Sequence, residues 1–187
     1  MVKNVLTSFE VAQCCHVTMT TVANWIKDGS LKAFKTKGGH RRIRREDLEL
    51  FARQYNMPLD ITPRILIVDD DMSVQTGLRQ LFESHAFVVD SAHNGFEAGV
   101  IVQKRRPDVI VLSILMSEFD GFEVIEYIKK HTDLKDIKII VLTGHAALEN
   151  TKKAKQAGAD ICIEKPVDSN TILKMVEKAI GHSYVLT

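Results

Sequence analysis

Five short runs of apolar residues recur along the C-terminal part of the chain, and amphipathic segments separate them. The runs lie at 65–68, 87–89, 109–112, 139–142 and 161–163. The first, third and fourth are continuously apolar, which is typical of central parallel strands buried on both faces. Between the runs, apolar residues return at helical spacing, as at Val74, Leu78 and Phe82. This alternation predicts an α/β fold of five βα units around a parallel sheet.

The first 56 residues show a different pattern, with short helices and a hairpin. Thr7 followed by Glu10 is a capping box that opens one helix. Thr18 can cap a second helix, which ends at Asp28-Gly29. Segments 31–35 and 41–44 flank two glycines and predict a basic β-hairpin, and a third helix is expected from about residue 46 to residue 55. These elements predict a small α+β winged helix-turn-helix.

The two patterns meet around two prolines, Pro58 and Pro63, which bracket a segment with neither a helical nor a strand period. We interpret this segment as a stiff linker. The expected organisation is therefore a two-domain chain, with a winged helix-turn-helix at 1–56, a linker at 57–63 and an α/β domain at 64–187.

Charge divides the chain in the same place. Residues 1–57 contain ten Lys and Arg against five Asp and Glu, whereas residues 58–187 contain fifteen against nineteen. A basic head indicates a polyanionic partner, and double-stranded DNA is favoured over a membrane because no lipidation signal or membrane-length apolar stretch accompanies it. The first residues lack the apolar core of a signal peptide, so we expect a cytoplasmic protein.

The cysteines do not form a disulfide framework, because Cys14 and Cys15 are adjacent and Cys162 belongs to the other domain. A metal site at Cys14-Cys15-His16 is an alternative, but no second ligand pair stands at zinc-finger spacing. We favour core positions for both cysteines, and likewise for Trp25.

Polar residues follow the apolar runs at the edge of the sheet where α/β proteins bind ligands. Asp69 and Asp70 follow the first run, Ser113 the third and Thr143 the fourth, while Lys165 closes the fifth unit. Adjacent carboxylates can hold a divalent ion, whereas a hydroxyl and a lysine can contact phosphoryl oxygens. The set contains the supporting parts of a phosphoryl-transfer site.

The motifs Ile-Leu-Ile-Val-Asp-Asp-Asp, Phe-Asp-Gly-Phe-Glu, Val-Leu-Thr-Gly and Ile-Glu-Lys-Pro resemble the response-regulator receiver family across residues 64–182. The resemblance implies a flavodoxin-like (βα)5 fold, with Asp69 and Asp70 as the magnesium-binding pair, Thr143 as the switch hydroxyl and Lys165 as the lysine that contacts the phosphoryl group. It also shows departures. Ser113 occupies the phosphoacceptor aspartate position, Ser117 a usual proline and Cys162 the switch aromatic position.

Serine cannot replace the phosphoacceptor aspartate chemically. Its hydroxyl needs a base to become nucleophilic, and it adds no charge to a magnesium site. We therefore expect a receiver that does not accept phosphate, no cofactor and no enzymatic activity, with Lys165 paired to Asp69 or Asp70. A weak magnesium site at Asp69 and Asp70 is one alternative. A hydrolytic dyad of Ser113 with His145 is another, less favoured because no orienting acid or oxyanion hole is visible.

Residues 5–55 resemble the excisionase and MerR-like winged helix-turn-helix family. The motifs are Leu-Thr-Ser-Phe-Glu-Val-Ala, Thr-Val-Ala-Asn-Trp-Ile-Lys-Asp-Gly-Ser-Leu and Gly-Gly-His-Arg-Arg-Ile-Arg-Arg-Glu-Asp-Leu. The resemblance implies that the second helix enters the major groove, and the basic hairpin favours phosphate or minor-groove contact over a merely solvated face. The expected DNA-binding residues are Thr20, Thr21, Asn24, Lys27, Lys35, Lys37, His40, Arg41, Arg42 and Arg44.

Together these features predict a DNA-binding transcriptional regulator whose receiver acts independently of phosphorylation. A single small head covers little DNA, so we expect a homodimer through residues 146–157 and 169–180 of the receiver, or a protein partner there. The alternative is an architectural or interaction protein, in which the receiver is a docking platform and the head anchors DNA with little sequence preference.

Overall fold

The computed structural model describes residues 5–60, 62–114, 116, 121–144 and 147–180. They form two compact units, divided between residues 61 and 62. Each unit has its own core and is described by itself. No helix in the described residues combines the length and the apolar composition needed to cross a membrane.

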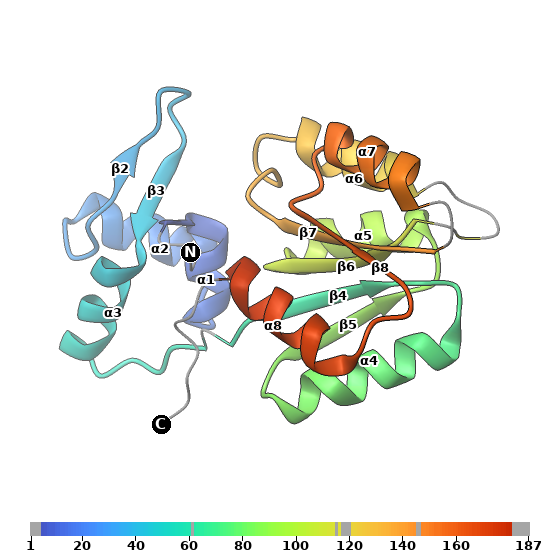
Figure 1. The fold of residues 1–187 in the computed structure, drawn as a ribbon. Helices are drawn as coiled ribbons and strands as arrows, with labels where there is room; N and C mark the ends of the chain where they lie inside the picture. Colours follow the sequence, from blue (N-terminus) through green and yellow to red (C-terminus); the bar gives the residue numbers. More distant parts are fainter. Residues whose placement is uncertain (1–4, 61, 115, 117–120, 145–146, 181–187) are drawn as a thin grey trace. The chain divides into compact units, whose positions relative to one another are not determined.

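The N-terminal unit is a small helix-turn-helix with an antiparallel sheet (Figure 1). Its elements are β1 (Val5–Thr7), α1 (Ser8–Cys14), α2 (Met19–Lys27), β2 (Phe34–Lys35), β3 (Arg41–Arg44) and α3 (Arg45–Gln54). The strand order is β1-β3-β2, and Leu6 pairs with Ile43. The strand β1 was not expected from the sequence, because three residues are too few to show a strand period.

The expected helix ends of this unit are confirmed. Thr7 and Glu10 form the capping box, with the Glu10 amide donating to Thr7 Oγ1 at 3.2 Å and the Thr7 amide donating to Glu10 Oε2 at 2.7 Å. The Thr21 amide donates to Thr18 Oγ1 at 3.1 Å at the start of α2. Gly29 has φ +84° after the end of α2, and His16 has φ +54° in the turn between the helices. Left-handed residues of this kind commonly end a helix and let the chain change direction within a tight turn.

The core of the N-terminal unit is built from both helices of the motif, the wing and α3. Its buried residues pack against one another and are Val11, Ala12, Cys15, Val22, Leu31, Ile43, Leu48 and Phe51. Trp25 packs on this core, its ring 4.8 Å from that of Phe51, which confirms its core position. Met57 and Leu59 also pack on it, and the Asp60 amide donates to the Cys14 carbonyl at 2.8 Å. The start of the segment interpreted as a linker therefore packs against the N-terminal unit.

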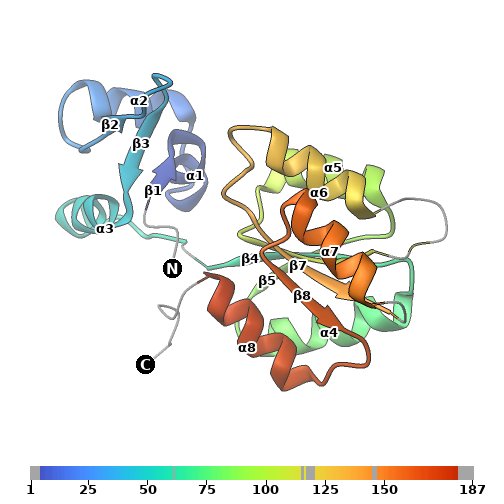
Figure 2. The same cartoon turned by 45° about the horizontal axis from the view of Figure 1, so that its top comes forward.

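The second unit is a flavodoxin-like α/β fold with a five-stranded parallel sheet (Figures 1 and 2). Its strands are β4 (Arg64–Val68), β5 (Val88–Ala92), β6 (Val109–Ser113), β7 (Lys138–Thr143) and β8 (Ile161–Glu164). Its helices are α4 (Met72–Ser84), α5 (Gly95–Arg105), α6 (Gly121–Lys130), α7 (Ala147–Ala157) and α8 (Ser169–Ile180). The strand order is β5-β4-β6-β7-β8, as expected for a (βα)5 fold.

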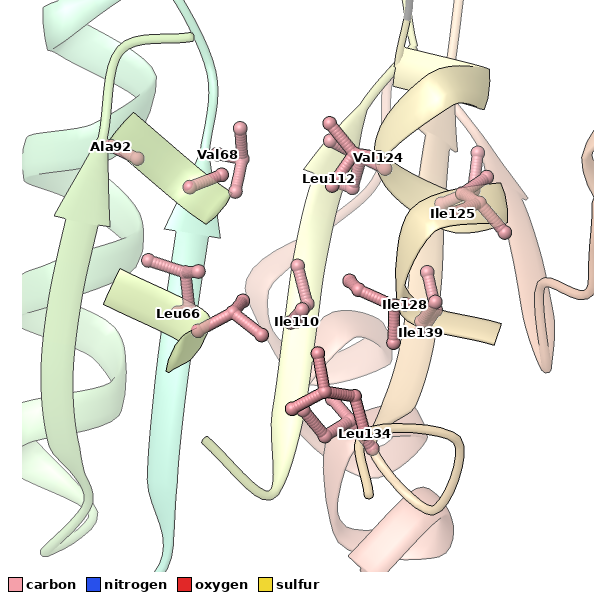
Figure 3. Packing of buried hydrophobic residues seen from close by; sticks show 14 of the residues in the cluster. Leu66, Val68, Ala92, Ile110, Leu112, Val124, Ile125, Ile128, Leu134 and Ile139 are labelled. Carbon is pink, nitrogen blue, oxygen red and sulfur yellow. The ribbon is translucent and has the colours of Figure 1, made fainter. Parts of the chain in front are cut away.

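Helices cover both faces of this sheet, which explains the continuously apolar strands. Helices α5, α6 and α7 lie on one face, and α4 and α8 lie on the other (Figures 1 and 2). Figure 3 shows the cluster between the sheet and the α5–α6–α7 side, to which Leu66 and Ile110 of the central strands and Ile125 and Ile128 of α6 belong. The strand order places the ends of β4 and β6 side by side, which is the edge that carries the polar residues.

A glycine sets how closely α6 begins to the end of β6. A Cβ on Gly121 would lie 2.9 Å from both the Ile114 Cα atom and the Ser113 carbonyl oxygen. Because both neighbours are backbone, a larger residue would push α6 away from Ser113. The glycine thus helps to fix the position of residue 113.

Candidate functional site

Four of the expected pocket residues converge at the carboxyl edge of the parallel sheet. Asp69 follows β4, Ser113 ends β6, Thr143 ends β7 and Lys165 follows β8. Asp69, Ser113 and Thr143 are buried, with relative exposures of 3%, 5% and 1%. The topology therefore gathers residues that are far apart in the sequence into one small polar site.

Lys165 lies at the centre of this site. Its ammonium Nζ donates to Asp69 Oδ2 at 2.9 Å and to Ser113 Oγ at 3.4 Å. The other Asp69 oxygen, Oδ1, accepts the Asp71 amide at 2.9 Å. Asp69 is thus neutralised by a lysine and hydrogen-bonded by the backbone, which is what a buried carboxylate requires. The expected pairing of Lys165 is observed, and its partner is Asp69.

The lysine is held in place by the neighbouring strand. Its backbone amide donates to the Thr143 carbonyl at 2.7 Å, and the following Lys165–Pro166 peptide bond is cis. The Thr143 hydroxyl donates to the Ile163 carbonyl at 3.4 Å, so it binds the backbone of β8. Within the described residues, Thr143 therefore borders the site without a side-chain hydrogen bond to Lys165 or Ser113.

The two aspartates after Asp69 have different surroundings. Asp70 is exposed. Asp71 begins α4, where its Oδ1 accepts the Ser73 hydroxyl at 2.6 Å and the Ser73 amide at 2.8 Å. The Ser73 hydroxyl, followed by its amide, lowers the pKa of the Asp71 carboxyl below its ordinary value. Asp71 is therefore a helix cap, a role that the run of three aspartates did not reveal.

The residues of the site fit a magnesium ion poorly. Mg²⁺ is usually held through one or two free carboxylates and keeps several waters in near-octahedral geometry. Asp69 Oδ2 is bound by Lys165, Asp71 caps α4, and residue 113 offers a neutral hydroxyl. In the part of the chain that the structure describes, no three His, Cys, Asp or Glu side chains lie close enough to hold a metal ion.

Sequence reasoning missed Gln75, which supports the site from beneath. Its side chain is buried, and Nε2 donates to the Asp69 carbonyl at 2.5 Å and to the Ala92 carbonyl at 3.2 Å. The same nitrogen lies 3.0 Å from His93 Nδ1. Gln75 thus joins α4 to the ends of β4 and β5. The available signal was a glutamine next to the apolar stripe of α4.

Of the departures from the receiver motifs at Cys162 and Ser117, the structure describes the one at Cys162. Cys162 is partly buried and packs against the α5–α6–α7 side of the sheet. Burial raises the pKa of its thiol, an effect that Lys155 reduces. Ser117 and His145 lie outside the described residues.

The second candidate site is the outer surface of α2 in the N-terminal unit. Thr20, Asn24 and Lys27 are exposed and follow one another at helical spacing. Thr21 is partly buried, and its hydroxyl lies 2.9 Å from that of Thr18 in the cap of the helix. The structure thus presents three of the four expected α2 residues to solvent and uses Thr21 in capping.

The wing continues the basic surface. Its tip is closed by Gly39, which has φ +78° and donates its amide to the Thr36 carbonyl at 2.8 Å. The expected contact residues Lys35, Lys37, His40, Arg41 and Arg44 are exposed, and Arg42 is partly buried.

Most of the expected contact cations have no acidic partner. In the described part of the chain, Lys27, Lys35, Lys37 and Arg41 form no ion pair, whereas Arg44 Nη1 lies 3.4 Å from Glu46 Oε1. The unpaired cations can neutralise phosphates without first breaking an internal contact.

Two family models match the chain. The response regulator receiver domain matches residues 65–177, and the helix-turn-helix domain matches residues 5–56. Response regulator MprA from Mycobacterium ulcerans is 37% identical over 103 residues, which are 55% of this chain and 44% of that protein. Response regulator MprA from Mycobacterium tuberculosis shows the same identity and coverage. The chain thus spans less than half the length of these curated relatives.

Solved structures resemble the second unit. The chemotaxis response regulator CheY4 of Vibrio cholerae aligns with a TM-score of 0.60 and 28% identity, covering 63% of this chain and 98% of that chain. The signal receiver domain of a DNA binding response regulator protein (merR) from Colwellia psychrerythraea aligns with a TM-score of 0.56 and 30% identity, covering 62% of this chain and 98% of that chain.

Proposed function

The chain belongs to the response regulator receiver domain family, and from this membership and its helix-turn-helix unit we propose a DNA-binding transcriptional regulator whose receiver acts without phosphorylation. The proposed division of labour assigns DNA binding to residues 1–56 and the receiver to residues 64–187. The segment 57–63 connects them, and the packing of Met57 and Leu59 anchors its start to the DNA-binding unit.

One observation carries the phosphorylation-independent part of the proposal, namely Lys165 between Asp69 and Ser113. A serine hydroxyl becomes a nucleophile only when a base removes its proton. The ammonium next to the Ser113 hydroxyl is a donor and cannot accept that proton. Lys165 therefore does not activate Ser113, which stands where the family carries its phosphoacceptor.

The ion pair between Lys165 and Asp69 also supports a site that no longer responds to a phosphoryl group. In the proposed receiver, Lys165 is already satisfied by Asp69 and needs no phosphoryl group as a counterion. The poor fit to magnesium supports the absence of a cofactor, and the missing nucleophile supports a protein that is not an enzyme.

The exposed residues of α2 and the wing support DNA binding. We propose that Asn24 reads a base edge in the major groove, because an amide side chain can make paired hydrogen bonds to adenine. Lys27 and the wing cations Lys35, Lys37 and Arg41 contact phosphates, which sets the position on the duplex without reading its sequence. Thr20, His40, Arg42 and Arg44 complete the proposed surface, and Thr21 contributes through the cap of α2.

A protein built this way needs a second copy or a partner. One small module buries too little surface for tight specific binding, so we propose a homodimer formed by the receiver, or a protein partner on it. Residues 146–157 and 169–180 are the surface that the family resemblance favours. We further propose that the protein acts in the cytoplasm, where response regulators meet DNA.

Selection from a pool of random DNA duplexes tests this function. The full chain should enrich a defined motif, and Asn24→Ala should relax the preference at one position of it. The competing function is an architectural protein with nonspecific anchorage. It would enrich no motif and show only a steep loss of affinity between two salt concentrations. A chain that retained no duplex even at low salt would contradict both.

A further inference from the structure

The helix α2 carries an exposed methionine that the core of the N-terminal unit does not use. Met19 is the first residue of α2 and is 53% exposed. The inner side of the helix is formed by Val22, which is buried, and Trp25, which packs on the core. The start of α2 does not need Met19 either, because Thr18 caps it and Val17, just before the cap, packs on the core. Core packing and capping therefore leave Met19 unexplained.

Met19 belongs to the same side of α2 as the residues proposed to contact DNA. At 3.6 residues per turn, the outward positions fall within an arc of about 140° around the helix axis. They are Met19, Thr20, Ala23, Asn24 and Lys27. Ala23 follows Met19 one turn later and is partly buried. Two apolar side chains therefore lie beside the polar contact residues.

The outward side of α2 lacks most of the groups that recognise a G·C pair. Arginine or lysine is the usual partner of guanine, and aspartate or glutamate accepts a hydrogen bond from cytosine. The helix contains no arginine, aspartate or glutamate, and its one lysine, Lys27, is its last residue. Asp28, just past the helix, accepts the Ser30 amide at 3.0 Å and belongs to the turn that follows.

The groups that α2 does present suit an A·T pair. An asparagine amide can make paired hydrogen bonds to adenine, and an apolar side chain can contact the 5-methyl group of thymine. In the part of the chain that the structure describes, the Asn24 side chain makes no hydrogen bond, so its amide is available to a base. With a rise of 1.5 Å per residue, Met19 and Asn24 are about 7.5 Å apart along the axis, which is the length of about two base-pair steps.

The position of Met19 at the start of α2 matters as much as its chemistry. In helix-turn-helix proteins the N-terminal residues of the second helix contact the base edges. The first turn of α2 contains no acidic residue that would repel DNA phosphates. Met19 therefore stands at the end of the helix that comes closest to the bases.

We propose that Met19, together with Ala23, reads the 5-methyl group of thymine in the major groove, within about two base pairs of the adenine that Asn24 reads. The duplex that this chain prefers then carries thymine and adenine under α2. This inference rests on the proposed DNA-binding function, and it names the bases that the second helix selects.

Deoxyuridine substitution in the duplex tests the inference. The motif that the full chain enriches from random duplexes is rebuilt with each thymine replaced in turn by deoxyuridine, which lacks the 5-methyl group and keeps the base pairing. Affinity measured by fluorescence anisotropy should fall about fourfold at the contacted thymine, as expected for one buried methyl group. Deoxyuridine in the DNA that flanks the motif should have no effect.

Variants of Met19 assign the loss to this side chain. Met19→Gln keeps the length of the side chain and removes its apolar end, so the ratio of affinities for the thymine and deoxyuridine duplexes should fall from about four to about one. Met19→Leu stays apolar and should keep a ratio above about two. Met72→Gln is the matched control, since Met72 is likewise the first residue of its helix, α4, and is 60% exposed. It should behave as wild type, and circular dichroism should show the wild-type fold for all three variants.

The inference is overturned by an enriched motif of G·C pairs alone, by an affinity that no deoxyuridine substitution changes, or by a Met19→Gln variant that keeps the full thymine preference. Each of these results leaves sequence-specific DNA binding standing. A chain that enriches no motif at all would instead refute the proposed function itself.

Discussion

Replacing Lys165 by methionine should destabilise the receiver, because it leaves Asp69 buried without its counterion. The ammonium lies 2.9 Å from Asp69 Oδ2. At that separation two unit charges attract by about 6 kcal/mol at an effective dielectric constant near 20, and by about 1.4 kcal/mol in water. The lysine side chain is 32% exposed, so solvent screens the pair partly. We expect a coupling energy of about 2 to 3 kcal/mol and a total cost of about 3 kcal/mol for Lys165→Met.

A double-mutant cycle measures this coupling directly. The four chains are wild type, Lys165→Met, Asp69→Asn and the double variant, each unfolded in urea. Far-UV circular dichroism is the appropriate signal, since the only tryptophan, Trp25, lies in the N-terminal unit. The double variant should recover much of the stability that Lys165→Met loses, because the uncompensated charge is gone.

Lys174→Met on the exposed side of α8 is the control for removing a lysine, and it should change stability by less than about 0.5 kcal/mol. Strictly additive effects of the Asp69 and Lys165 substitutions would refute the reasoning. They would show that the lysine does not neutralise Asp69 in solution, and that the site remains open to another cation.

Three further predictions concern packing, pH and DNA. Gly121→Ala should lower the free energy of unfolding in urea by about 1 to 3 kcal/mol, because the added Cβ meets backbone atoms. Gly77→Ala is the control: it has open space within α4 and should raise the free energy of unfolding by about 0.5 to 1 kcal/mol. Equal effects of the two substitutions would contradict the close approach of α6 to β6. Burial raises the pKa of the Asp160 carboxyl, but a backbone amide and two lysines outweigh it, and the net pKa is lowered below 3.8. A carboxyl with a lowered pKa stabilises the fold fully above its unfolded pKa of 3.8, and this stabilisation is lost as the pH falls through the folded pKa. Asp160→Asn should therefore lower the free energy of unfolding by about 1 to 2 kcal/mol at pH 7 and flatten the dependence of stability on pH below 4. An unchanged dependence on pH would refute this prediction. Arg41→Gln should lower the salt slope of duplex binding by about 0.9, while Arg53→Gln at the exposed end of α3 should leave it unchanged; identical slopes would remove Arg41 from the phosphate contacts.

The sequence was sufficient for features that depend on local pattern. The capping box at Thr7, the end of the second helix at Asp28-Gly29 and the five parallel strands all follow from residue type and spacing, and each is observed. The strand β1 was missed because its pairing with β3 joins segments more than thirty residues apart, and three residues carry no period of their own.

The same limit applies at the site. Spacing placed Asp69, Ser113, Thr143 and Lys165 at one edge of the sheet, but three consecutive aspartates look alike in a sequence. Only the backbone directions after β4 show that Asp69 points to Lys165. The buried amide of Gln75 was missed for a related reason, because its partners are backbone carbonyls whose positions the sequence does not specify.

Duplex affinity before and after treatment with acetyl phosphate and magnesium tests the central claim most directly, with intact mass recorded on the same samples. A receiver that carries aspartate at the position of Ser113 serves as the positive control for the phosphodonor. The full chain should keep its mass and its DNA affinity unchanged. A stoichiometric phosphorylated species accompanied by a shift in affinity would contradict a receiver that works without phosphorylation.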